Sequence, residues 1–213
     1  MRAQLSRELR RPLCIYIETK HPTYFDSIGL SLEEPLVAEL NEAGLNRRGA
    51  PAYVQSFELT NLQELDNELE LKVPLVFLAT LGGAPYDLVS IGDPRTYADL
   101  LMPDSLQHLR RDLDGIGPAK TMVIPWEADG TLGEPTTLVD DAHDAGLVVH
   151  PYTFRAQNQF LPGDYRSSAV AIDFGHVIDE MKAYLSAGVD GYFTDQADLG
   201  VVARDEWLVR PLD

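Results

Sequence analysis

Short apolar runs alternate along this chain with segments in which apolar residues recur every three to four positions. The runs are predicted strands over residues 13–17, 52–57, 75–79, 147–150 and 191–195, with a short strand and turn over 114–118. Residues 122–125 either extend the sheet or begin the next loop. The amphipathic segments are predicted helices over residues 31–43, 60–69, 105–113, 137–145 and 173–187, and residues 1–11 have the pattern of a further helix. Apolar strands that are each separated by a helix are typical of a parallel sheet covered on both faces.

Two parallel architectures are common enough to consider. No predicted strand is followed by a Gly-x-Gly-x-x-Gly fingerprint or a Walker loop, so a nucleotide-binding open sheet is disfavoured. We therefore predict an α/β fold of the TIM (β/α)8 barrel type. No low-complexity linker divides the chain, which predicts a single domain over residues 1–213.

Composition narrows the classes of partner. The chain has 17 basic and 34 acidic side chains, a net charge of −17, which disfavours nucleic acid and anionic lipid as partners of the whole surface. No apolar stretch reaches the ~18–20 residues that a spanning helix needs, so we expect no membrane insertion. Cys14 is the only cysteine, which excludes an internal disulfide framework and a cysteine-based zinc site.

Polar side chains follow the first predicted strand. Glu18 and Lys20 are two residues apart, so their side chains face the same side of an extended chain. At the mouth of a barrel, the carboxylate would suit a hard cation such as Mg²⁺ or Ca²⁺, and the ammonium would suit a phosphate. The alternative is a plain salt bridge at a strand end.

Other strand-end residues have two interpretations each. His150 is a lone histidine on an apolar strand, a position more typical of a core residue than of a catalyst. Tyr152 could stack on a sugar or alcohol group, or simply pack at the barrel rim. His21 is expected on the face opposite Lys20, in a structural or loop role. The run Thr80–Pro85 is interpreted as a turn rather than as a phosphate loop, because two adjacent glycines are a weak signal.

Five segments, taken in order, resemble motifs of one family. They are Ile17–Pro22 with its Glu-x-Lys, Val54–Phe57 with its Gln-Ser-Phe, Asp114–Pro118, Leu147–Arg155 and Asp190–Asp195. Together they resemble the glycerophosphodiester phosphodiesterase family, most closely its periplasmic or secreted bacterial type. The resemblance extends over nearly the whole chain.

This resemblance implies a (β/α)8 barrel that hydrolyses glycerophosphodiesters to glycerol 3-phosphate and an alcohol, in lipid and glycerol metabolism. It implies that Glu18 is a ligand of a divalent cation, Ca²⁺ or Mg²⁺. It also implies that Lys20 holds the phosphate and that Phe57, His150 and Tyr152 bind the substrate. A periplasmic or secreted location is expected from the resemblance alone.

The sequence departs from the family at its beginning. The family's His-Arg motif, its Glu-x-Asp motif and a second histidine have no match here, so we expect no catalytic acid-base histidine in this chain. We expect a barrel that lacks its first two β/α units, and self-association through the open edges. The alternative function is a catalytically inactive barrel remnant that binds glycerophosphodiesters or a protein partner.

Overall fold

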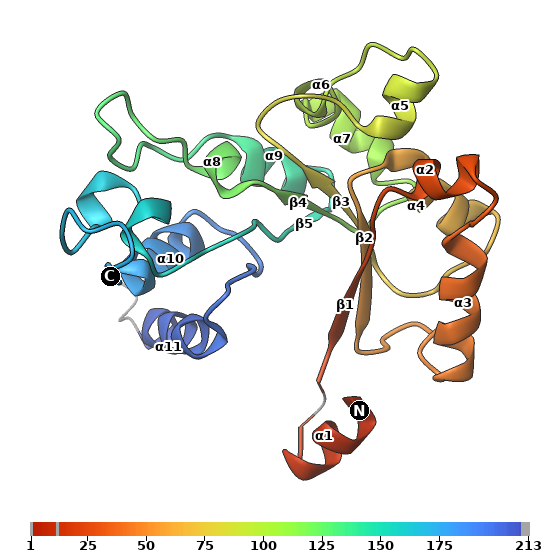
Figure 1. Ribbon diagram of the computed structural model, residues 1–213, viewed down its shortest axis with the longest axis horizontal. Coiled ribbons are helices and arrows are strands. Elements are labelled where there is room, and N and C mark those ends of the chain that lie inside the picture. Colours follow the sequence, from red (N-terminus) through yellow and green to blue (C-terminus); the bar gives the residue numbers. More distant parts are fainter. Residues whose placement is uncertain (1, 12, 210–213) are drawn as a thin grey trace. The chain divides into compact units, whose positions relative to one another are not determined.

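The chain forms two compact units, residues 1–115 and residues 116–213 (Figure 1). They are seen in a computed structural model that describes residues 2–11 and 13–209. Each unit has its own buried core and is described by itself below. The expectation of one domain over residues 1–213 stays a prediction.

The first unit contains three adjacent parallel strands. They are β1 (Ile15–Thr19), β2 (Ala52–Ser56) and β3 (Leu75–Ala79), with β2 in the middle. Glu18 lies opposite Gln55, and Ser56 lies opposite Phe77. The predicted strands and their parallel pairing are confirmed, although β1 lies two residues later than expected. Cys14, directly before β1, is exposed.

The helices of the first unit are mostly short. The two predicted over residues 31–43 and 60–69 are confirmed as α3 (Glu33–Glu42) and α4 (Leu59–Asn67), and the one predicted over 105–113 begins and ends earlier, as α7 (Pro103–Leu109). The others are α1 (Arg2–Glu8), α2 (Pro22–Ser27), α5 (Tyr86–Ser90) and α6 (Tyr97–Leu100). Helix α2 begins at a proline, whose fixed φ and missing N–H suit the first helical position.

A buried hydrogen-bond chain fixes the end of β1 against the helices. The Thr19 hydroxyl donates to Asn61 Oδ1 at 2.7 Å, and the Asn61 amide donates to Glu33 Oε1. All three residues are buried, so the polar groups need these partners. The next residue, Lys20, therefore leaves the sheet from a well-anchored position.

The second unit contains β4 (Gly115–Pro118) from Ile116 on, and its neighbour β5 (Val148–Val149); a parallel bridge between Ala119 and Tyr152 follows them. The N–H of His150 donates to the Ile116 carbonyl at 2.9 Å, and the N–H of Tyr152 donates to the Pro118 carbonyl at 3.1 Å. The helices are α8 (Lys120–Val123), α9 (Leu138–Asp144), α10 (Val177–Ser186) and α11 (Ala197–Leu208), with 3-10 turns η1 (Asn158–Phe160) and η2 (Gly163–Tyr165).

One predicted strand of the second unit is wrong, and residues 122–125 do not extend the sheet. Residues 191–195 form no strand; Thr194 makes one isolated parallel bridge to Phe154. Residues 120–123 form helix α8, and Pro125 lacks the N–H that a ladder at 122–125 would need. Apolar runs of four or five residues do not by themselves distinguish a strand from a buried turn or helix.

Candidate functional site

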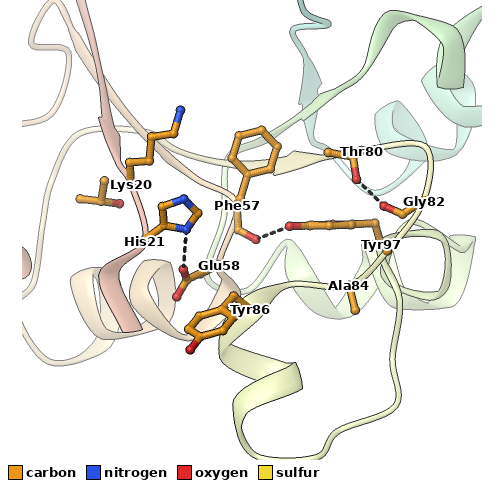
Figure 2. Close-up of a pocket in the computed structure, with 11 residues that line it drawn as sticks. Lys20, His21, Phe57, Glu58, Thr80, Gly82, Ala84, Tyr86 and Tyr97 are labelled. Atoms are coloured by element: carbon orange, nitrogen blue, oxygen red, sulfur yellow. Dashed lines mark hydrogen bonds and ion pairs between the residues drawn. The ribbon is translucent and has the colours of Figure 1, made fainter. Parts of the chain in front are cut away.

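A pocket of about 390 Å³ opens at the carboxyl ends of β1, β2 and β3, within the first unit (Figure 2). It is lined by the residues that follow the three strands and by α5 and α6: Thr19, Lys20, His21, Phe57, Glu58, Thr80, Gly82, Gly83, Ala84, Tyr86 and Tyr97. Two of the substrate-binding residues expected from the sequence, Lys20 and Phe57, are therefore brought together.

Lys20 presents an exposed ammonium beside the pocket. Its side chain is 71% exposed, and Nζ lies 3.9 Å from Oε1 of Glu18, so the two residues do face the same side. The salt-bridge interpretation of this pair is thus realised. An exposed ion pair contributes only ~0–1 kcal/mol, so the ammonium can exchange Glu18 for an anionic ligand at little cost. Glu18 itself does not line the pocket.

Aromatic side chains form one wall. Phe57 follows β2, and its carbonyl accepts a hydrogen bond of 3.1 Å from the Tyr97 hydroxyl. The two rings meet edge to face, with centroids 6.4 Å apart. Tyr97 also packs on Phe77 of β3, so this wall is tied to the centre of the sheet. Phe57 is therefore held in place for contact with an apolar part of a ligand.

His21 also belongs to this pocket, although we expected a structural or loop role for it. Its backbone is left-handed, with φ 58°, and its ring lies above the buried Glu58 (Figure 2). Nδ1 lies 4.0 Å from Glu58 Oε1, and Oε2 of the same carboxylate accepts the Thr23 N–H at 3.0 Å. The available sequence signals were a histidine directly before a helix-starting proline and an acidic residue soon after the neighbouring strand.

His150 and Tyr152 lie in the second unit. His150 directly follows β5, and its ring packs against Gly191, where an added Cβ would approach Cδ2 to 3.1 Å. Burial lowers the pKa of His150, and the charge of Asp190 opposes this shift. The carbonyl of Tyr152 accepts the Lys120 N–H at 2.8 Å. The expected substrate-binding roles of both residues stay predictions.

The described residues do not complete the ligand shell of a hard divalent cation. Within residues 2–11 and 13–209, no group of three or more His, Cys, Asp or Glu side chains is arranged to hold a metal ion. Glu18 offers one carboxylate, which faces an ammonium. Mg²⁺ and Ca²⁺ require about six or more oxygen ligands, so Glu18 could supply only part of such a site.

Similarity to known proteins identifies the family of this chain. A family model described as the glycerophosphoryl diester phosphodiesterase family matches residues 15–199. The chain belongs to this family. It is 29% identical over 199 residues to a glycerophosphodiester phosphodiesterase of Arabidopsis thaliana, covering 87% of this chain and 49% of that protein. It is 23% identical over 209 residues to one of Haemophilus influenzae, covering 92% of this chain and 54% of that protein.

Solved structures support the fold of the family member. A crystal structure of a glycerophosphodiester phosphodiesterase from Parabacteroides distasonis matches with a TM-score of 0.53 at 12% identity, over 96% of this chain and 61% of that one. The predicted fold class, an α/β chain with part of a TIM barrel, is confirmed. The chain spans about half the length of the curated relatives it matches. None of the helices in the described residues has the length and apolar character to cross a membrane.

Proposed function

We propose that this chain acts in the hydrolysis of glycerophosphodiesters to glycerol 3-phosphate and an alcohol. The observation that carries the proposal is that Lys20 and Phe57 leave adjacent strands and line one pocket, in a chain of this family. A pocket of about 390 Å³ has the size of a small-molecule site, which ranges over roughly 300–1,000 Å³. Because the chain carries a net charge of −17, a local cation is the natural anchor for an anionic ligand.

Lys20 and Phe57 would bind different parts of the ligand. The Lys20 ammonium would hold the phosphate by charge-assisted hydrogen bonds. Phe57 would contact the carbon skeleton of the ligand beside it. Held in this way, the phosphorus is open to water, whose oxygen bonds to it as the ester bond to the alcohol breaks and the alcohol oxygen takes a proton. Positioning of this kind lowers the entropic part of the activation barrier for hydrolysis.

Further parts of the proposal rest on the family. Ca²⁺ or Mg²⁺ is the proposed cofactor, with Glu18 as one ligand, and the described residues do not complete the oxygen shell. His150 and Tyr152 are proposed to contact substrate. The proposed setting is lipid and glycerol metabolism in the periplasm or outside the cell.

One observation favours a second function. Because the described residues contain no metal-binding cluster, the chain would also serve as a binding protein for glycerophosphodiesters that leaves the ester intact. Lys20 and the aromatic wall would make the contacts of such binding.

The test measures release of glycerol 3-phosphate from glycerophosphocholine, with Ca²⁺, with Mg²⁺ and with a chelator. Lys20→Ala is expected to raise KM about tenfold or more and to lower kcat, because the ammonium binds charge in both ground and transition states. Lys72→Ala, which removes another exposed lysine of the same unit, is the control and should match the wild type. Unchanged kcat/KM in Lys20→Ala would contradict the role of Lys20, and binding without release would support the second function.

A further inference from the structure

The pocket floor contains a buried carboxylate oxygen without a hydrogen-bond partner in the described part of the chain. It is Oε1 of Glu58, whose side chain is 2% exposed. The other oxygen of this carboxylate is fixed by the Thr23 N–H, at the start of α2. A buried carboxylate oxygen without a hydrogen bond costs free energy. A hydrogen-bond donor close to Glu58 Oε1 would remove this cost.

His21 is placed to supply that donor. Its Nδ1 is the atom that faces Glu58 Oε1, at 4.0 Å, roughly 1 Å beyond a hydrogen bond. The left-handed backbone of His21 turns the ring over Glu58, a conformation that is uncommon for residues other than glycine. A small rotation of the ring closes the distance, as apo sites commonly tighten when a ligand arrives.

This pairing fixes what the opposite side of the ring can do. A neutral imidazole that carries its proton on Nδ1 has a lone pair on Nε2, so Nε2 accepts a hydrogen bond. Figure 2 shows this second nitrogen turned away from Glu58, on the side of Lys20. Lys20, which precedes His21 and pairs with Glu18, and Glu58, which faces Nδ1, are the charged groups that this proposal uses.

We propose that His21 binds a hydroxyl group of a polyol phosphate through Nε2, with Glu58 as its positioning residue. The inference rests on the proposed function for one element, the Lys20 ammonium as the phosphate anchor, and deepens it by naming the ligand class. Lys20 and His21 are adjacent in sequence, and both line the pocket. A phosphate on Lys20 thus brings a hydroxyl two or three bonds away within reach of the imidazole. The pair discriminates hydroxylated phosphate esters from plain alkyl ones.

Calorimetric titration at pH 8 with two probes, glycerol 3-phosphate and propyl phosphate, tests this assignment. The wild type should bind glycerol 3-phosphate roughly three- to tenfold more tightly, the effect of one hydrogen bond to a neutral group. His21→Phe should abolish the preference, and His21→Gln, whose amide oxygen also accepts, should restore part of it. Glu58→Gln should weaken the preference, whereas Lys20→Ala should weaken both ligands equally.

His108→Phe, a change at another exposed histidine of the same unit, is the matched control and should keep the preference. Equal affinity of the wild type for the two probes overturns the inference, and so does a preference that survives in His21→Phe. Binding of neither probe at millimolar concentration also overturns it. A preference as expected, together with no release of glycerol 3-phosphate from glycerophosphocholine, supports the inference and rejects the proposed hydrolysis.

Discussion

Glu18 has two interpretations with different consequences. As a partner of Lys20 alone, at 3.9 Å, it adds little to stability or binding. As a metal ligand, it would be needed for any response of the activity to Ca²⁺ or Mg²⁺. We predict that Glu18→Gln removes the metal-stimulated part of glycerophosphocholine hydrolysis and leaves the urea midpoint unchanged. Glu39→Gln, at an exposed position on α3, is the control; a normal metal response in Glu18→Gln would reject the ligand role.

His150 links stability to pH. Burial lowers its pKa in the folded state, so the unfolded chain binds a proton more readily as the pH falls through ~6.5. Protonation therefore favours unfolding, and the contribution of His150 is present above that pH and lost below it. We predict that the unfolding free energy of the wild type falls more steeply between pH 7.5 and 5.5 than that of His150→Gln, as measured by urea melts.

The control for this comparison is His108→Gln, because His108 is exposed. It should follow the wild-type profile. Parallel profiles for the wild type and His150→Gln would show that His150 does not titrate with unfolding.

The sequence predicts some site residues and misses others for a physical reason. Lys20 and Phe57 follow predicted strands, and the carboxyl ends of parallel strands lie at one edge of a sheet. His21 was assigned to the opposite side by strand alternation, but the strand ends at Thr19 and the left-handed turn at His21 redirects the ring. A single backbone angle, which no periodicity reveals, therefore brings His21 to the pocket.

At the scale of elements, a buried ion pair joins α8 to α10. Lys120 Nζ lies 2.6 Å from Glu180 Oε1 and also donates to the Phe160 carbonyl at 2.9 Å. Burial lowers the pKa of Lys120 and raises the pKa of Glu180, because each charge has lost its water. Removing one partner of such a pair strongly lowers the free energy of unfolding, whereas replacing both partners with apolar residues is often neutral or stabilising.

We predict that Lys120→Met destabilises the chain by about 3–5 kcal/mol, because it leaves the Glu180 charge buried and unpaired. The double variant Lys120→Met with Glu180→Leu should recover most of this loss. Urea unfolding of the wild type, both single variants and the double variant gives the coupling free energy. Lys182→Met, which removes ion pairs to the exposed carboxylates of Asp179 and Glu206, should cost less than about 1 kcal/mol. Additive effects of the two core changes would contradict the prediction.

A strand is predictable from the sequence where both of its faces are buried. The strand at residues 75–79 is buried along its length and was predicted with its observed bounds. Residues 191–195 contain only the aromatic pair Tyr192 and Phe193 between polar or small residues, and the chain there follows side-chain contacts such as the bond from the Tyr192 hydroxyl to the Gly200 carbonyl. Helix α11 was missed because residues 197–208 mix apolar and charged positions without a clear face.

At the scale of the whole molecule, the net charge opposes self-association and the open edge of the sheet favours it. Among the described residues of the first unit, β1 pairs with β2 alone. An edge strand is a template for pairing with another chain, whereas a net charge of −17 keeps copies apart.

We predict that the chain self-associates and that salt promotes this, because screening removes the repulsion between copies. Size-exclusion chromatography with light scattering should show species larger than 23.6 kDa, and their fraction should rise between about 50 and 500 mM NaCl. A monodisperse monomer at every salt concentration, with one cooperative urea transition, would contradict this prediction.

The exposed thiol of Cys14 stands directly before β1, the strand with the open edge. Neighbouring strands lie about 4.8 Å apart, and a disulfide needs Cα atoms within roughly 7 Å of each other. Two copies that met edge to edge with Cys14 opposite Cys14 would therefore meet the distance requirement for covalent locking. Glutathione would keep them separable in a reducing cytosol, while an oxidising compartment would trap the pair. The redox state of the surroundings would then decide whether an encounter between two copies is reversible.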